Sequence, residues 1–144
     1  MATNVQIVFD CTSPDRLARF WAEALHYQLD APPEGFATWE EALKAWGVPE
    51  EERDSASAIV DPEGAGPRIY FQRVAAPKTG KNRVHLDLNE GGGSRAPAEE
   101  RRQRIGAAVE RLAALGATRL RVHDEGPEFW VVMQDPEGNE FCVQ

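Results

Sequence analysis

The chain has 144 residues, of which 42% are hydrophobic and 28% are charged. This balance excludes a disordered chain, a collagen-like chain and a coiled coil, and the length suits one domain or two small halves joined together. The longest apolar run, Phe129–Met133, is far too short to cross a bilayer. Met1–Asn4 has neither the basic start nor the apolar core of a secretory signal, so we expect a cytoplasmic protein.

The formal net charge is −8, from 16 basic and 24 acidic residues. A net anion of this size is repelled by nucleic acid and by anionic membranes, so we expect neither as a partner. The balance is compatible with a neutral or cationic small ligand. Cys11 and Cys142 are too few for a disulfide framework, and a reducing compartment would keep both as thiols.

The first half of the sequence predicts strands around one amphipathic helix. Ser13 and Pro14 form a helix start signal, and the apolar side chains that follow recur with helical spacing. The expected elements are a strand at Asn4–Asp10, a helix from Pro14 through Leu25, a short helix from Thr38 to near Gly47, and strands at Ser55–Val60 and Arg68–Val74. We expect Leu17, Phe20, Trp21 and Leu25 to be buried against this sheet.

The second half predicts the same kinds of element. A strand at Arg83–Asn89 is followed by a long helix at Pro97–Leu115, with Ile105, Ala108, Val109 and Leu112 on its buried stripe. Strands are then expected at Thr118–Val122, Phe129–Gln134 and Glu140–Val143.

Three matches in the same order indicate an internal repeat. The tetrapeptide Asp-Pro-Glu-Gly begins at residues 61 and 135, prolines open both main helices, and Gln6 and His85 hold corresponding places in the opening strands. We therefore predict a duplicated βαβββ unit of about 70 residues, with repeats at about 4–74 and 83–143. A half of this size buries too little surface to be stable alone, so both should pack into a single α+β domain spanning 1–144.

Several segments resemble one known superfamily. These are Val5–Trp21, Pro67–Val74, Lys81–Leu88 and the closing Asp135–Cys142. Together they are similar to the vicinal oxygen chelate superfamily, which includes glyoxalase I, bleomycin-resistance proteins and extradiol dioxygenases. The resemblance implies a cupped, eight-stranded mixed sheet with the helices outside, and a homodimer.

The strand phases indicate which polar side chains line the concave face of such a sheet. Alternation places seven of them opposite the apolar faces, namely Gln6, Tyr70, Gln72, His85, Asp87, Glu140 and Cys142. We expect them to gather in one cavity, with Trp39, Trp46 and Trp130 as candidate walls for an apolar or aromatic ligand. The alternative is that these residues are only the solvent-facing side of half-exposed strands.

The resemblance also implies a test for a metal site. Metal-dependent relatives carry four ligands, commonly His or Gln, Glu, His and Glu. Here Gln6 falls at the first position, Tyr70 or Gln72 at the second, His85 at the third and Cys142 at the fourth, with Glu140 two residues earlier. No carboxylate stands at the second position, so we expect no metal cofactor. Zinc or nickel held by Gln6, His85 and Cys142 is the alternative.

Without a metal, His85 can act as a general acid or base with Glu140 or Asp87 as its partner, or as a neutral hydrogen-bonding group. We therefore predict a small-molecule enzyme of the lyase or isomerase kind. The alternatives are a protein of the bleomycin-resistance type that sequesters a drug or metabolite without catalysis, and a structural or regulatory module. His26 and His123 are expected to carry no chemistry. Lys81 and Arg83 either bind an anionic group or pair with surface carboxylates.

Overall fold

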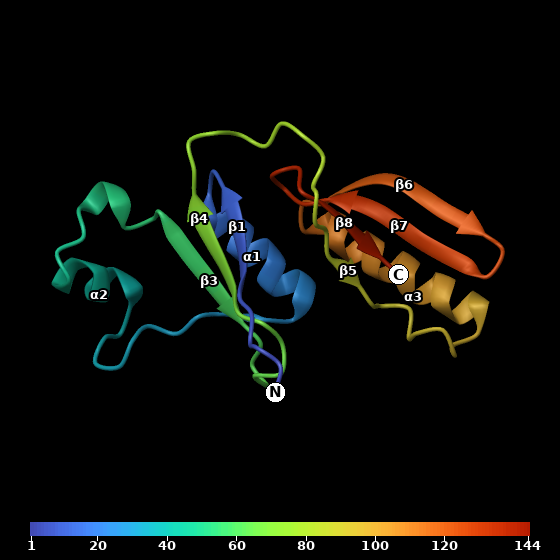
Figure 1. The fold of residues 1–144 in the computed structure, drawn as a ribbon, viewed down its shortest axis with the longest axis horizontal. Helices are drawn as coiled ribbons and strands as arrows, with labels where there is room; N and C mark the ends of the chain where they lie inside the picture. The colour runs from blue at the N-terminus through green and yellow to red at the C-terminus, as the bar shows by residue number, and fades with distance from the viewer. The chain divides into compact units, whose positions relative to one another are not determined.

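A computed structural model describes residues 1–144, and the chain divides into two compact units at residues 1–77 and 78–144. Each unit carries a four-stranded sheet, and the two sheets are shown with their helices in Figure 1. The division falls close to the predicted boundary between the repeats. That both halves form one domain stays a prediction. No helix has both the length and the apolar composition needed to span a membrane.

The first unit contains every element predicted for it and one additional strand. Its elements are β1 (Ile7–Cys11), α1 (Pro14–Leu25), β2 (Gln28–Leu29), α2 (Trp39–Ala45), a 3-10 turn (Glu50–Glu52), β3 (Ala56–Val60) and β4 (Ile69–Arg73). The sheet order is β1-β4-β3-β2, with β1 and β4 parallel and the other pairs antiparallel. The two-residue strand β2 was not predicted because it is too short to show alternation.

The core of the first unit lies between α1 and the sheet. Leu17, Phe20 and Trp21 are buried as predicted, and the Trp21 ring lies 5.4 Å from that of Phe9 on β1. The prediction for Leu25 is wrong, because this residue is only half-buried. It is the last helical residue, and His26 after it turns the chain away with a φ of 58°.

The second unit repeats this topology. Its elements are β5 (Asp87–Leu88), α3 (Ala98–Ala114), β6 (Thr118–Glu125), β7 (Glu128–Gln134) and β8 (Glu140–Val143), in the sheet order β5-β8-β7-β6. The edge strand β5 is parallel to its neighbour β8, just as the edge strand β1 is parallel to β4 in the first unit. The α+β class and the duplicated βαβββ modules are therefore confirmed.

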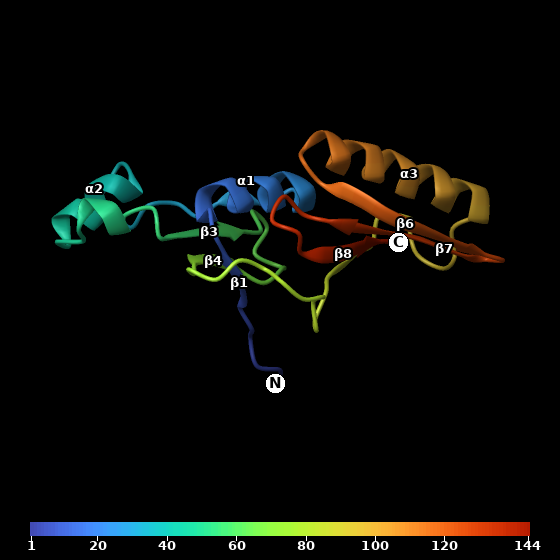
Figure 2. The same cartoon turned by 90° about the horizontal axis from the view of Figure 1, so that it is seen from above.

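One face of the second sheet is covered by α3, as Figure 2 shows from above. The predicted stripe is buried at Ile105, Val109 and Leu112, and it packs against apolar side chains of β7 and β8. Val131, Met133, Phe141 and Val143 are the buried residues of those two strands. Because side chains alternate along a strand, the intervening residues lie on the opposite, open face.

The two Asp-Pro-Glu-Gly segments form the same turn. Gly64 and Gly138 have φ values of 72° and 85°, which glycine adopts without strain. Asp61 Oδ1 accepts a hydrogen bond from the backbone N–H of Glu63 at 2.9 Å, and Asp135 Oδ1 accepts one from Glu137 at 2.9 Å. The repeat seen in the sequence is thus a repeat in backbone geometry.

Two strands differ most in length from those expected, while the bounds of the others differ by three residues or fewer. The strand predicted at Arg83–Asn89 is reduced to β5, and Val84, expected on an apolar face, is 81% exposed. Here the backbone N–H of Asn82 bonds to the Glu140 side chain rather than to a neighbouring strand. Conversely, β6 extends beyond Val122 to Glu125 and so includes His123.

Candidate functional site

The open face of the second sheet places four side chains in one row across the strands. Asp87 on β5 pairs with Cys142 on β8, Cys142 pairs with Val132 on β7, and Val132 pairs with Arg121 on β6. Directly paired residues point to the same side of a sheet. Segments that are far apart in the sequence therefore present an acid, a thiol, an apolar group and a base side by side.

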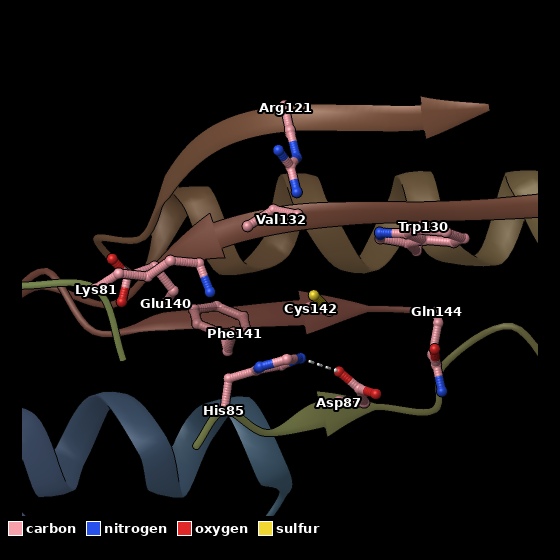
Figure 3. Close-up of a pocket in the computed structure, with 10 residues that line it drawn as sticks. All are labelled: Lys81, His85, Asp87, Arg121, Trp130, Val132, Glu140, Phe141, Cys142 and Gln144. Carbon is pink, nitrogen blue, oxygen red and sulfur yellow. Dashed lines mark ion pairs between the residues drawn. The ribbon is translucent and has the colours of Figure 1, made fainter. Parts of the chain in front are cut away.

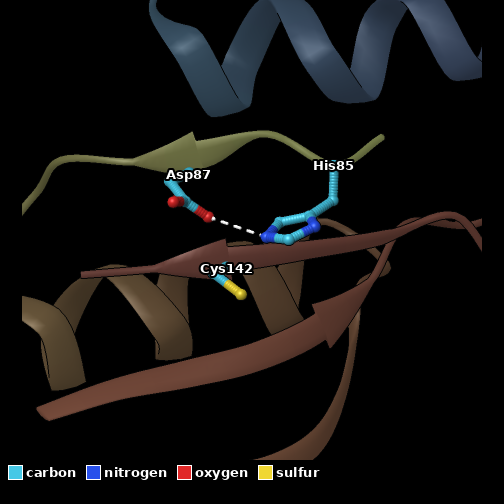
Figure 4. A group of neighbouring side chains, drawn as sticks. All are labelled: His85, Asp87 and Cys142. Carbon is cyan, nitrogen blue, oxygen red and sulfur yellow. Dashed lines mark ion pairs between the residues drawn. The ribbon is translucent and has the colours of Figure 1, made fainter. Parts of the chain in front are cut away.

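His85 lies at the acidic end of this row. Its Nε2 atom is 3.2 Å from Oδ1 of Asp87, and both side chains are a little under half exposed, at 43% and 44% (Figure 4). His85 is two residues before β5, in a segment attached to β8 by the hydrogen bond from Cys142 N–H to the Leu86 carbonyl. Of the two partners predicted for His85, Asp87 is the one that the structure pairs with it.

Cys142 is the third member of this group. Ligand atoms of His85, Asp87 and Cys142 all lie within 4.8 Å of one another. Partial burial raises the pKa of the Cys142 thiol, and the neighbouring Asp87 carboxylate raises it further by charge and by accepting a hydrogen bond. Cys142 is therefore a protonated thiol at neutral pH, with little nucleophilic character.

Glu140 makes a different set of contacts. Its carboxylate forms an ion pair with Lys78 at 3.0 Å and accepts a hydrogen bond from the Asn82 backbone N–H at 3.0 Å. Burial by itself would raise the pKa of Glu140, but the bonds from Asn82 and Lys78 outweigh it and lower the pKa to about 2. The carboxylate thus holds the segment that leads to His85, and no ion pair joins it to His85.

These residues line a cavity of about 330 Å³ in the second unit (Figure 3). The lining residues are Lys81, His85, Asp87, Arg121, Trp130, Val132, Glu140, Phe141, Cys142 and Gln144. Four of the residues that the sequence placed on the concave face are among them, together with Trp130. Arg121 was missed, because alternation in a half-exposed edge strand does not show which face will border a cavity.

Trp130 forms one wall of the cavity and stacks on His123. The two ring centroids are 3.6 Å apart and the planes differ by 16°. His123 was expected to lie in a loop without a function, but β6 carries it directly opposite Trp130. Its Nε2 atom is buried without a hydrogen-bond partner. His123 thus covers one face of the Trp130 indole. The contact depends on the register between β6 and β7, which the sequence pattern does not show.

The remaining predicted site residues belong to the first unit. Gln6 Oε1 accepts a hydrogen bond from Arg68 at 2.7 Å, and Arg68 also pairs with Asp30 and lies over the Tyr70 ring. Gln72 donates a hydrogen bond to Asp10 at 2.7 Å. These contacts form a polar network on the open face of the first sheet. That Gln6, Tyr70 and Gln72 join His85 in one cavity stays a prediction.

Two tryptophans of the first unit, Trp39 and Trp46, lie on α2 and directly after it. Trp39 donates from its indole N–H to the Asp30 carbonyl at 2.8 Å, and its ring lies 6.4 Å from that of Trp46. Both are exposed. Their role as ligand walls also stays a prediction.

The donor set can be tested against a metal ion. His85, Asp87 and Cys142 offer one nitrogen, one oxygen and one sulfur, which suits the tetrahedral preferences of zinc but not the oxygen-rich shell of manganese. The set differs from the predicted one, because Asp87 replaces Gln6 as the third candidate. Any metal bound there must first displace the thiol proton of Cys142.

The fold and this cavity define a class of protein: paired βαβββ modules that carry a polar pocket on the open face of a sheet. A family model described as Glyoxalase-like domain matches residues 6–144. The chain belongs to this family, within the vicinal oxygen chelate superfamily.

Solved structures agree with this assignment at the level of the fold. A mutant of the fosfomycin resistance protein FosX from Listeria monocytogenes, complexed with Mn(II) and 1S,2S-dihydroxypropylphosphonic acid, matches with a TM-score of 0.61 and 11% identity, covering 100% of this chain and 90% of that one. FosX from Mesorhizobium loti has a TM-score of 0.61 and 7% identity, covering 99% and 91%.

A glyoxalase/bleomycin resistance protein/dioxygenase family enzyme from Burkholderia phytofirmans has a TM-score of 0.60 and 13% identity, covering 96% of this chain and 94% of that one. No curated protein sequence matches the chain. At these identities the likeness concerns the fold alone, so the activity has to be argued from the site.

Proposed function

We propose that the cavity of the second unit binds a small organic molecule and that His85 transfers a proton to or from it. The observation that carries this proposal is the pairing of His85 with Asp87 on the wall of a cavity that also presents an aromatic face. Histidine is the side chain most often used for general acid and base catalysis. Reactions of this type are typical of lyases and isomerases.

Asp87 gives the imidazole a defined role. A carboxylate 3.2 Å from Nε2 favours a proton on that nitrogen and leaves the lone pair on Nδ1. Nδ1 has no hydrogen-bond partner within the protein and is the atom we assign to proton exchange with the ligand. Asp87 then stabilises the imidazolium that forms when Nδ1 takes up a proton.

The other polar residues have supporting roles. Glu140 is a positioning residue, because its two carboxylate oxygens are occupied by Lys78 and by the Asn82 N–H. Trp130 provides a flat apolar surface for the body of the ligand. The Cys142 thiol lies within 4.8 Å of the Asp87 carboxylate, and its interaction with that carboxylate raises the pKa of the thiol.

A metal is not required for this chemistry. A zinc ion in this pocket would be held by His85, Asp87 and Cys142 and would supply a Lewis acid that polarises a ligand oxygen. The Mn(II) in the Listeria FosX complex supports metal binding by this fold. No step of the proposed proton transfer passes through a metal.

Deuterium exchange tests the proposal without knowledge of the natural substrate. Small carbonyl compounds with acidic C–H bonds are incubated with the protein in deuterated water, and deuterium incorporation is followed by NMR. We expect the wild-type protein to accelerate exchange for some of them, since Nδ1 removes the proton and returns a deuteron. His85→Asn should abolish the acceleration, whereas His26→Asn, at an exposed helix end, should retain it.

The same compounds separate catalysis from sequestration. Binding is followed through amide and Trp130 indole resonances in the cavity. Binding of several compounds without exchange of any would contradict the catalytic proposal and favour a protein of the bleomycin-resistance type. Equal exchange by wild type and His85→Asn would remove His85 from the reaction.

A further inference from the structure

We propose that this cavity selects small organic anions and that Lys81 and Arg121 bind their charged oxygens. The inference rests on the proposed function, because it names the class of ligand for the same pocket. It also reverses the expectation from net charge, which favoured a neutral or cationic ligand. The charge of the whole chain, −8, does not describe this pocket.

Both basic side chains are free to bind a ligand. Lys81 and Arg121 line the cavity, and neither forms an ion pair or a hydrogen bond within the protein. Seven of the other twelve arginines form ion pairs, as Arg68 does with Asp30 and Arg102 with Asp124. In an acidic protein, where carboxylates are abundant, two unpaired cations on one cavity wall indicate a missing anion.

The acidic groups of the cavity offset these two positive charges only in part. Glu140 is neutralised by Lys78, and the carboxylate of Asp87 is shared between His85 and the Cys142 thiol. Asp87 therefore leaves at most one negative charge against two positive ones.

The positions of these groups also define the shape of the ligand. Arg121 lies at the opposite end of the cross-strand row from Asp87, with Cys142 and Val132 between them. Adjacent strands are roughly 4.8 Å apart, so the row spans about 14 Å between backbones. In Figure 3 the Arg121 guanidinium extends over Val132, and Lys81 approaches from the side of Glu140.

A ligand that reaches both ends must carry an oxyanion and a short apolar body. The guanidinium of Arg121 can donate two parallel hydrogen bonds to a carboxylate, phosphonate or phosphate group, and Lys81 adds a point charge. The apolar body would lie over Val132 and against Trp130, with its other end near His85. Carboxylates and phosphonates share this recognition chemistry, and the probes below distinguish them.

Matched pairs of acids and amides test the inference. Benzoate, phenylacetate and phenylphosphonate are titrated into the full chain, alongside benzamide and phenylacetamide, and binding is followed through cavity amide and Trp130 indole resonances. We expect the acids to bind at least about tenfold more tightly than the amides, because charge-assisted hydrogen bonds are lost in the neutral compounds. Added salt should weaken binding of the acids only.

Four variants assign the effect to named residues. Lys81→Met and Arg121→Met should each weaken binding of the preferred acid by about tenfold. Arg83→Met and Arg119→Met remove the same charge from the same two segments but line no part of the cavity, so they should have little effect. Arg119 is a close control, since it pairs with the buried Met133 and lies on the opposite face from Arg121.

The outcomes separate this inference from the proposed function. Equal binding of acids and amides in the cavity, or equal losses in all four variants, would overturn anion selection and leave proton transfer by His85 intact. Anion selection is also overturned if neither the acids nor the amides shift the cavity amide and Trp130 indole resonances. The proposed function fails on a different result, namely that compounds bind in the cavity without deuterium exchange or that wild type and His85→Asn exchange deuterium equally. Tight binding of phenylphosphonate alone would identify the anion as a phosphonate or phosphate.

Discussion

The carboxylate of Glu140 accepts a hydrogen bond from the backbone N–H of Asn82 at 3.0 Å, and this contact holds the chain three residues before His85. The Asn82 side chain returns a bond to the Glu140 carbonyl at 3.2 Å. The pair therefore joins the start of β8 to a segment that has no strand partner of its own there. Because Glu140 is only 13% exposed, water competes weakly for these bonds.

Loss of the hydrogen bond from the Asn82 N–H to the Glu140 carboxylate should destabilise the segment that leads to His85. We expect Glu140→Ala to lower the free energy of unfolding by roughly 1–3 kcal/mol, since the Asn82 N–H loses its partner and Lys78 loses its counter-charge. Urea unfolding and hydrogen exchange at the Asn82 amide measure the two effects. Glu110→Ala, on the exposed face of α3, is the control and should change neither. Unchanged exchange at Asn82 would contradict the positioning role.

The lowered pKa of Glu140 predicts how stability depends on pH. The pKa is about 2 in the folded protein and 4.5 is its ordinary value, so the folded state favours the carboxylate. The stabilisation is complete above the unfolded pKa and is lost as the pH falls from about 4.5 toward about 2. Unfolding free energies measured across this range should fall more steeply for wild type than for Glu140→Gln. Parallel curves would refute the linkage.

The burial of α1 predicts that truncating its side chains lowers the free energy of unfolding by an amount that depends on how deeply each one is buried. Phe20 is 4% exposed and its ring meets that of Trp21 edge-on at 5.3 Å, so Phe20→Ala should cost roughly 3–5 kcal/mol. Leu25→Ala, at the half-buried end of the same helix, should cost clearly less. Chemical denaturation of both variants measures the difference. A loss under about 1 kcal/mol for Phe20→Ala would show that the helix packs by another face.

The homodimer inferred from the resemblance stays a prediction. We expect light scattering at high micromolar concentration to report twice the 16.0 kDa mass of the chain. A mass of one chain across the concentration range would reject it.

Metal analysis tests the expectation that the site works without a metal cofactor. After purification without chelators, we expect less than one equivalent of zinc, nickel or manganese. The physical reason is that the Cys142 thiol is held in its protonated form and that Asp87 is already shared with His85. One full equivalent of zinc that is lost in Cys142→Ser would contradict this expectation and assign the metal to the pocket.

The fold class could be predicted because it depends on local patterns that are visible in the sequence. The stripe of Ile105, Val109 and Leu112 depends only on helical period, and the paired Asp-Pro-Glu-Gly turns depend on side chains that bond to their own backbone. The same local reasoning overextended the strand before Asn89. The apolar–polar alternation around Val84 predicted a strand there. In the structure, the nearby Asn82 N–H bonds to the Glu140 side chain, which is distant in sequence, and not to a neighbouring strand.

Side-chain alternation along β5 and β8 has a fixed period, so the sequence by itself determined that Asp87, Glu140 and Cys142 share one face of the sheet, and it predicted His85 beside them. Only the tertiary structure decided which of them meet. Asp87 rather than Glu140 pairs with His85, while Arg121 and the His123–Trp130 stack complete the cavity. These contacts depend on the register of β5, β6, β7 and β8, which is established by packing across the sheet and leaves no local pattern in the chain.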